Sequence, residues 1–229
     1  WQYQTIISTQ DETQEIYQLM LQIITESGKE LSGSDYLEVA SKTGLIMVLD
    51  RFTLEHAIRI IRAGEQKNIY SRTLLNQVFS DYQSRDLRTK KLATITKLNL
   101  PIGSMIFQFS QNEAVENISI LGEIASELKQ AKIKVCLSDF DFTKAAWNIA
   151  RKFNVGWIRL KPFDKHSPIL DSDNPDSLQK IIRKAHVLGY KVIVTRVDSA
   201  GFAADLWKLD VDYLQGNFIQ TPVRDIFSD

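Results

Sequence analysis

The 229-residue sequence has few of the features that mark a specialised class of protein. Its single cysteine, Cys136, excludes an internal disulfide and suits a reducing compartment, so we expect a cytoplasmic protein. Lysine plus arginine and aspartate plus glutamate both number 28, and the absence of net positive charge argues against binding of long nucleic acid. No apolar run approaches about 18 residues and no signal peptide is present, so we expect no export and no membrane insertion.

What is present fits one globular domain. The hydrophobic fraction is 44% and the charged fraction 24%, both ordinary for a globular chain. Because the chain does not begin with Met, we interpret residues 1–229 as a single domain cut from a longer multidomain protein. Cys136 lies in an apolar run, where we expect a buried, unreactive thiol. The histidines at 56, 166 and 186 are too far apart to predict a zinc motif.

Short apolar strands alternate with amphipathic helices from about residue 70 onward. Such alternation predicts parallel strands joined by right-handed crossovers. The number of strand–helix units favours a closed α/β barrel, a TIM-like (β/α)8 fold. The predicted strands are Ser71–Val78, Met105–Ser110, Ile133–Ser138, Trp157–Lys161, Val192–Val197 and Tyr213–Gln215.

Apolar spacing and end signals predict the helices. Glu113–Gln130 carries an apolar stripe and is predicted to form one helix. Asn174-Pro175 is expected to open a further helix and Gly189 to close it. The candidate elements nearer the N-terminus are the helices Tyr36–Lys42 and Phe52–Ala63, and Glu15–Ile24, which fits either a strand or a helix.

Motifs at the predicted strand ends resemble, in order and spacing, those of EAL-domain cyclic di-GMP phosphodiesterases. The resemblance is strongest at the closing motif, Asp212–Phe218 followed by Thr221-Pro222. The other matching segments are Tyr3–Ile6 (family YQPI), Ser41–Ile46 with Leu49–Phe52 (family TGLI and LD.W), and Leu137–Phe140 (family DDFG). The resemblance covers nearly the whole chain and implies an EAL-type barrel.

The positions that this resemblance assigns to catalysis have changed. The name-giving Glu-Ala-Leu falls on Gln18-Leu19-Met20, so an amide stands where the family has a carboxylate, and Arg159 stands where it has the catalytic lysine. Asn76, Asp139 and Gln215 keep the family's residue types. The remaining replacements are Gln108 and Gln111 for two glutamates, Ser138 for an aspartate, Lys161 for the aspartate after the lysine, and Thr195-Arg196-Val197-Asp198 for Glu-Gly-Val-Glu.

These replacements bear on the divalent metals that hydrolysis in this family requires. Metals polarise the phosphate and activate water, and hard cations need several anionic oxygen ligands. Asn76 and Asp139 supply only one carboxylate between them. We therefore predict a degenerate phosphodiesterase with no metal cofactor and no hydrolytic activity.

The same replacements favour binding of an anion. Arg159, Lys161 and Arg196 place positive charge where cyclic di-GMP would bring its two phosphates, and the lost carboxylates would have repelled them. By the resemblance, Asp50 and Asp198 would accept hydrogen bonds from guanine edges, and Arg196 would stack on a base. The predicted ligand-binding set is Gln18, Leu19, Met20, Gln22, Asp50, Asn76, Asp139, Arg159, Arg196, Asp198 and Gln215.

This pattern resembles the FimX-type branch of the family, which binds cyclic di-GMP without hydrolysing it. That likeness implies a receptor that signals to a protein partner, such as a PilZ-type adaptor in type IV pilus function or motility. A nucleotide-free scaffold is the alternative, because Gln22 replaces an arginine that contacts phosphate in most relatives; residual hydrolysis is a third. Plainer roles also exist for single residues: Asp50 as a helix N-cap, and Arg196–Asp198 as a surface ion pair.

Overall fold

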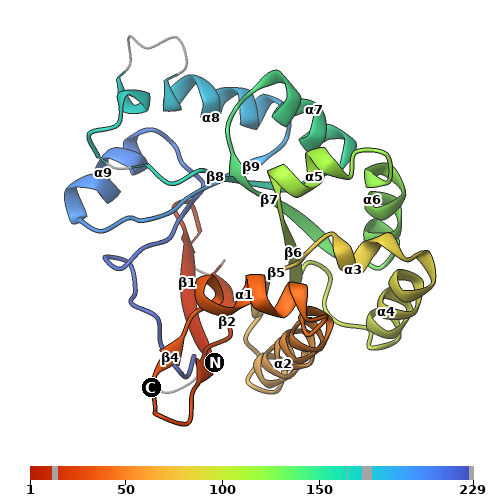
Figure 1. Ribbon diagram of the computed structural model, residues 1–229. Helices are drawn as coiled ribbons and strands as arrows, with labels where there is room; N and C mark the ends of the chain where they lie inside the picture. The colour runs from red at the N-terminus through yellow and green to blue at the C-terminus, as the bar shows by residue number, and fades with distance from the viewer. Residues whose placement is uncertain (12–14, 164, 172–176, 227–229) are drawn as a thin grey trace.

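The computed structural model describes residues 1–11, 15–163, 165–171 and 177–226, and eight of its strands close into a barrel. The closed order is β1-β10-β9-β8-β7-β6-β5-β2 (Figure 1), which confirms the TIM-like barrel of the α/β class. The barrel strands are β1 Gln2–Ser8, β2 Ile16–Met20, β5 Arg72–Asn76, β6 Met105–Ser110, β7 Lys134–Phe140, β8 Trp157–Leu160, β9 Lys191–Val194 and β10 Tyr213–Leu214.

The barrel is mixed, unlike the repeated parallel units that the sequence pattern predicts. β1 runs antiparallel to both neighbours, with Gln4 opposite Gln18 on β2 and Ile7 opposite Leu214 on β10. The other pairs are parallel. The stretch between Ser8 and Ile16 is shorter than the dozen or so residues that a parallel crossover needs, so these two strands pair as neighbours in a hairpin arrangement.

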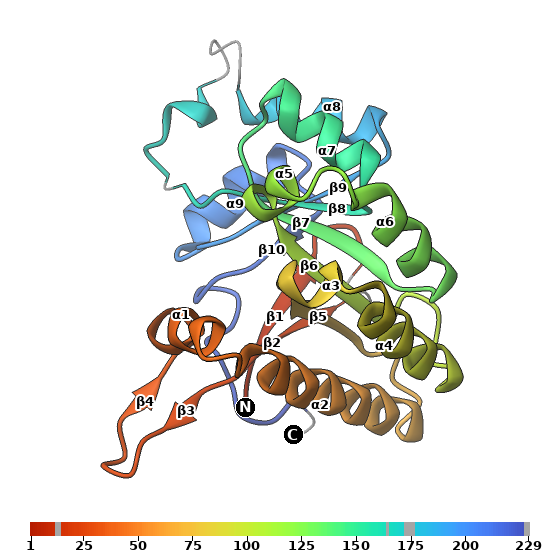
Figure 2. The same ribbon diagram turned by 45° about the vertical axis from the view of Figure 1, so that its right-hand side comes forward.

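Helices cover the outside of the barrel (Figures 1 and 2). Their apolar faces turn inward; α8, for example, buries Leu178, Ile181, Ile182 and Ala185. The helices are α1 Gly33–Lys42, α2 Ile46–Gln66, α3 Ser80–Gln83, α4 Arg85–Lys97, α5 Gln111–Glu116, α6 Leu121–Gln130, α7 Lys144–Lys152, α8 Leu178–Val187 and α9 Ala200–Lys208, with a 3₁₀ turn at Pro168–Leu170. Among the described residues, no helix has both the length and the apolar character needed to cross a bilayer.

Two predicted helices differ from the structure. Glu113–Gln130 is not one helix but two, α5 and α6, and the first ends at Glu116 with Asn117 as its C-cap. The Asn117 side chain donates to the Glu113 carbonyl at 2.8 Å, a local bond of the kind that competes with continued helix. The helix predicted at Phe52–Ala63 begins earlier, at Ile46, which excludes the alternative role of Asp50 as its N-cap.

The remaining predictions of elements fare as follows. Gly189 has φ +80° directly after the C-cap of α8, which confirms its role in ending that helix. The N-cap of α8 is Ser177, and the expected opening at Asn174-Pro175 lies outside the described residues. The ambiguous Glu15–Ile24 segment is extended: it holds β2 and then β3 Ile23–Ile24, which pairs with β4 Glu30–Leu31. Figure 2 shows this small hairpin beside α1, away from the barrel.

A layer of apolar side chains fills the middle of the barrel. Its members come from seven of the eight barrel strands, and Trp157 of β8 packs against them. They are Ile6, Ile16, Leu74, Ile106, Cys136, Ile193 and Tyr213. The thiol of Cys136 is fully buried there, as predicted, and burial raises its pKa to about 12. This layer closes the barrel below the site.

Candidate functional site at the barrel mouth

The next layer, at the C-terminal ends of the parallel strands, is polar throughout. Side chains two positions apart on a strand point to the same side, so one residue from each barrel strand follows the apolar layer toward the mouth. We call these eight residues the mouth layer: Gln4, Gln18, Asn76, Gln108, Ser138, Arg159, Thr195 and Gln215. The mouth layer contains no carboxylate and one charged residue, Arg159.

Hydrogen bonds join most of this layer into a network. Gln215 Nε2 donates to Gln18 Oε1 at 2.7 Å and to Gln4 Oε1 at 3.0 Å. Gln108 Nε2 donates to Asn76 Oδ1 at 2.7 Å. Arg159 Nη1 links the two halves, because it donates to Gln18 Oε1 at 3.0 Å and to Gln108 Oε1 at 3.3 Å. The amides of Gln18 and Gln108 therefore hold an arginine.

Arg159 is a cation without an ion pair to any described residue. Burial lowers the pKa of its guanidinium, and Cys136 and Asp139 act in the opposite direction. Arginine stays protonated in proteins even so. Its bonded partners are neutral amide oxygens, so none of its hydrogen bonds is an ion pair. A desolvated charge of this kind is costly unless an opposite charge joins it. The mouth layer is therefore chemically suited to an anion.

A hollow of about 340 Å³ opens beside the mouth, between the end of β2, α1 and the start of α2. Leu37, Leu49 and Val78 give it apolar walls, and Tyr36 adds an aromatic one. Six of the predicted ligand-binding residues line it: Gln18, Leu19, Met20, Gln22, Asp50 and Asn76. Gln22 brings no charge there, and its side chain donates to Gln2 Oε1 at 3.3 Å.

Asp50 enters the hollow from α2 and is held from behind. Its Oδ1 accepts from Gln77 Nε2 at 2.7 Å, and its Oδ2 accepts from Lys91 Nζ at 2.5 Å. Sequence reasoning missed Gln77 and Lys91. Gln77 directly follows Asn76 at the end of β5, and this strand-end position is a sequence signal for a residue near the site. Lys91 lies 41 positions from Asp50 on another helix, and no local pattern connects them.

The other predicted residues sit at the rim or in the network. Arg159 and Gln215 reach the hollow through their bonds to Gln18. Asp139, near the end of β7, and Arg196 and Asp198, just after β9, are exposed, and β8 lies between these two strands. The ion pair considered for Arg196 and Asp198 is absent, and neither residue is ion-paired to any other described side chain.

The rim is built on unusual backbone. Asp139 and Arg196 have φ of +55° and +58°, a region that non-glycine residues seldom occupy and that concentrates at functional sites. Val197 is buried, although its sequence neighbours Arg196 and Asp198 are exposed. Its N–H donates to the Gln215 carbonyl at 3.1 Å. A Cβ on Gly216 would lie 2.2 Å from the backbone of Val197, so only glycine permits this approach.

The donors at the mouth do not fit a divalent metal. Within the part of the chain that the structure describes, no three His, Cys, Asp or Glu side chains converge as a metal site would require. Magnesium and calcium prefer anionic oxygens in sets. The mouth layer offers neutral amides and hydroxyls, together with a guanidinium that would repel a cation.

Comparisons with known proteins place this geometry in a family. The EAL domain model matches residues 1–222. The signalling protein YkoW of Bacillus subtilis is 22% identical over 224 residues, which are 96% of this chain and 28% of YkoW. Cyclic di-GMP phosphodiesterase PdeF of Escherichia coli is 18% identical over 206 residues, 90% of this chain and 28% of PdeF. The chain thus spans less than a third of these relatives.

Solved structures share the fold. The EAL domain of Pseudomonas aeruginosa FimX bound to cyclic di-GMP superposes with a TM-score of 0.85 at 21% identity, covering 100% of this chain and 92% of that one. The Xanthomonas citri FimX EAL domain in complex with the same ligand gives 0.84 at 17% identity, covering 100% and 89%.

Proposed function

This chain belongs to the EAL domain family, and we propose that it is a receptor that binds cyclic di-GMP without a divalent metal and without hydrolysing it. The observation that carries the proposal is the mouth layer, which presents Arg159 and no carboxylate. Relatives of known structure, the FimX domains, are described in complex with cyclic di-GMP, which supports this choice of anion.

The charges at the mouth suit the parts of this ligand. A phosphate beside Arg159 would supply the anion that the half-buried guanidinium lacks, and the neighbouring amide groups can donate further bonds. One guanine would enter the hollow and present its N1–H and N2–H₂ donors to Asp50. The second would lie at the rim, where Arg196 can stack and Asp198 can accept.

Hydrolysis needs more than this site offers. When divalent metals are bound, they polarise the scissile phosphate and lower the pKa of the attacking water. With Gln18, Gln108 and Ser138 at the mouth, the described residues offer no anionic set to hold them. Bound nucleotide would therefore remain intact, as a receptor requires.

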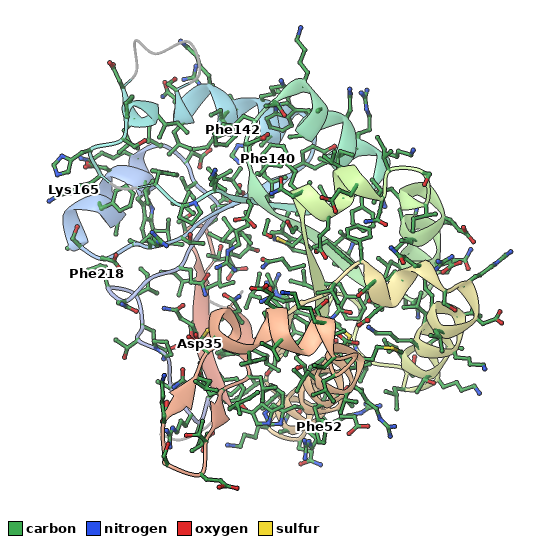
Figure 3. The ribbon with its side chains drawn as sticks, in the orientation of Figure 1. Asp35, Phe52, Phe140, Phe142, Lys165 and Phe218 are labelled. Atoms are coloured by element: carbon green, nitrogen blue, oxygen red, sulfur yellow. The ribbon has the colours of Figure 1, made fainter. Side chains whose placement is uncertain are left out.

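Signalling to a protein partner has a matching surface. Six large apolar side chains are exposed on α1 and the start of α2, where Figure 3 labels Phe52. We call them the α1–α2 apolar surface: Leu37, Val39, Leu45, Met47, Val48 and Phe52. Leu37 also lines the hollow, so this surface adjoins the nucleotide site. Clusters of exposed apolar residues commonly mark protein–protein contacts. A PilZ-type adaptor in the cytoplasm is the partner that we propose.

The same surface favours a second candidate, a protein scaffold that no longer binds nucleotide. Gln22, which lines the hollow with an amide where most relatives have a phosphate-binding arginine, points the same way. The receptor explains the uncompensated Arg159 and the scaffold does not, so we place it first.

Titration calorimetry with cyclic di-GMP, with and without EDTA, separates these functions. The receptor predicts saturable binding of one ligand per chain that EDTA does not weaken, and chromatography should recover the cyclic dinucleotide unchanged. If no heat is measured at millimolar ligand, the receptor is excluded and the scaffold becomes the proposed function. Release of linear dinucleotide in the presence of magnesium would overturn the assignment as a non-enzyme.

A further inference from the structure

A closed cluster of polar side chains lies behind the nucleotide hollow. Lys91 of α4 reaches Asp50 at 2.5 Å and Gln77 Oε1 at 2.8 Å, while Gln77 Nε2 reaches the other oxygen of Asp50 at 2.7 Å. The hydroxyl of Tyr82 also donates to Gln77 Oε1. Both oxygens of Asp50 are thus fixed from the protein side, so its carboxylate plane cannot rotate freely.

The ammonium of Lys91 is itself held in place. It lies 4.7 Å from the ring centre of Tyr82 and 5.5 Å from that of Phe107, within cation–π range. The side chains of Lys91 and Asp50 are only 15% and 12% exposed. Asp81 stands nearby, and burial together with the charge of Asp50 raises its pKa while Lys91 opposes that rise. Lys91 is therefore the cation that faces both carboxylates.

The proposed site has two opposing requirements for Asp50: its carboxylate has to accept from guanine, and its charge must not repel the phosphates. The contacts of Lys91 and Gln77 meet both requirements. A carboxylate suits the reading of guanine, because its two acceptor oxygens match the two adjacent N–H donors of the base. A ligand with two phosphates is repelled by a carboxylate in a partly dry pocket. A cation bonded to the far side of Asp50 cancels its charge and leaves lone pairs free on each oxygen, since an ionised carboxylate has about four acceptor positions.

We propose that Lys91 is a positioning residue for base specificity: with Gln77, it orients and neutralises Asp50 so that the hollow selects guanine over adenine. This inference rests on the proposed function, because it concerns the same nucleotide site. Adenine presents an acceptor next to its amino group, and the fixed carboxylate would face that acceptor without a proton between them.

The test compares cyclic di-GMP with cyclic di-AMP by calorimetry on three variants of the full chain. Lys91→Met removes the ammonium and keeps most of the stem, Lys91→Arg restores a cation, and Lys90→Met is the control at the exposed neighbouring position. Lys91→Met should weaken cyclic di-GMP by about 10- to 100-fold, the loss expected for hydrogen bonds to a charged group. Cyclic di-AMP should change little, Lys91→Arg should recover most guanine preference, and Lys90→Met should match wild type.

Thermal melting accompanies each titration, because removing one partner of a buried ion pair destabilises proteins. If Lys91→Met does not melt cooperatively, Lys91→Gln, which keeps a donor to Asp50 and loses the charge, takes its place with the same expected loss of guanine preference. An equal loss for both dinucleotides, or an unchanged preference, overturns the inference and leaves the receptor standing. A wild-type chain that binds neither removes the proposed function, and the inference falls with it.

Discussion

A buried carboxylate at one end of the barrel has three partners, whereas the guanidinium at the other end has only amides. Asp212, at the N-terminal end, is 2% exposed and accepts from His186 Nε2 at 2.7 Å, Lys191 Nζ at 2.6 Å and the Val192 N–H at 2.9 Å. Arg159, at the mouth, has no ion pair among the described residues.

The difference separates a structural charge from a functional one. Asp212 is compensated within the chain, so it joins strand to helix and needs nothing from outside. Arg159 makes no ion pair with a described residue, so the proposed anionic ligand is the partner that would compensate it. Both side chains are polar groups next to the same apolar interior. Their partners, more than their burial, indicate which end binds a ligand.

Removing the satisfied charge should have the largest effect on stability. Asp212→Ala leaves the imidazole, the ammonium and a buried N–H without their acceptor, and we expect a loss of about 3–5 kcal/mol. Urea unfolding measures it, with Asp205→Ala, in an exposed pair with Lys208, as the control that should change little. Ligand affinity of the folded fraction should persist. If the free energy of unfolding falls by less than about 1 kcal/mol, Asp212 is not the structural charge that the comparison assumes.

Removing the charge of Arg159, which has no ion pair, should lower ligand affinity but not the stability of the fold. Arg159→Met should weaken cyclic di-GMP by about 10- to 100-fold, because a charge-assisted contact to phosphate is lost. Its melting temperature should equal or exceed that of wild type, since a half-buried charge without an ion pair has gone. The exposed Arg151→Met is the matched control. A melting temperature that falls as far as in Asp212→Ala would make Arg159 structural too.

Supplying the missing carboxylate should make the two ends alike. Gln18→Glu would place an anion at the position that now lies 3.0 Å from Arg159 Nη1, which would satisfy the arginine internally and repel phosphate. We expect affinity for cyclic di-GMP to fall by about tenfold, as a change of roughly 1.4 kcal/mol would give, with no loss of stability. Gln130→Glu, on the exposed end of α6, should bind as wild type does. Tighter binding by Gln18→Glu would contradict the electrostatic argument.

The smallest expected effect lies beside the barrel, at His56. Burial, together with the charge of Arg59, lowers the pKa of His56 from its ordinary 6.5 to about 4, and the ring of Trp1 stacks on the imidazole with 4.2 Å between ring centres. The fold thus favours neutral imidazole, so its stabilising contribution is complete above pH 6.5 and is lost as pH falls through 4.

Melting temperatures at pH 7 and pH 5 test this assignment. Wild type should lose more on acidification than His56→Gln, by a few degrees, and the exposed His166→Gln should follow wild type. Equal losses in all three would show that His56 is not kept neutral by the fold. The comparison between charges with and without partners would then apply only to groups inside the barrel.

Parts of the fold could be read from the sequence because their signals are local. Alternating apolar residues gave the span of β6 without error and placed β5, β7, β8, β9 and β10 to within a few residues. The split between α5 and α6 was not foreseen, because the side-chain bond from Asn117 competes with a helical pattern that continues past it. The reversed β1 was missed for another reason: strand direction depends on its partners.

The candidate site shows the same division. The strand-end residues Gln18, Asn76, Arg159 and Gln215 were predicted from position and family resemblance, and they do converge. The fixing of Asp50 by Gln77 and Lys91 was not predicted, because a contact between two helices leaves no trace in the spacing of either one.

The sequence alone determined which chemical groups this chain possesses and where they fall along it: the periodicity of its strands, and the amides and cations at the strand ends. Only the tertiary structure decided which of these groups meet. Closure of the barrel brings Gln4 against Gln215, 211 positions away, and leaves Arg159 among neutral acceptors. Side-chain identity is a local property, whereas compensation of a buried charge depends on neighbours that folding brings together from distant parts of the chain.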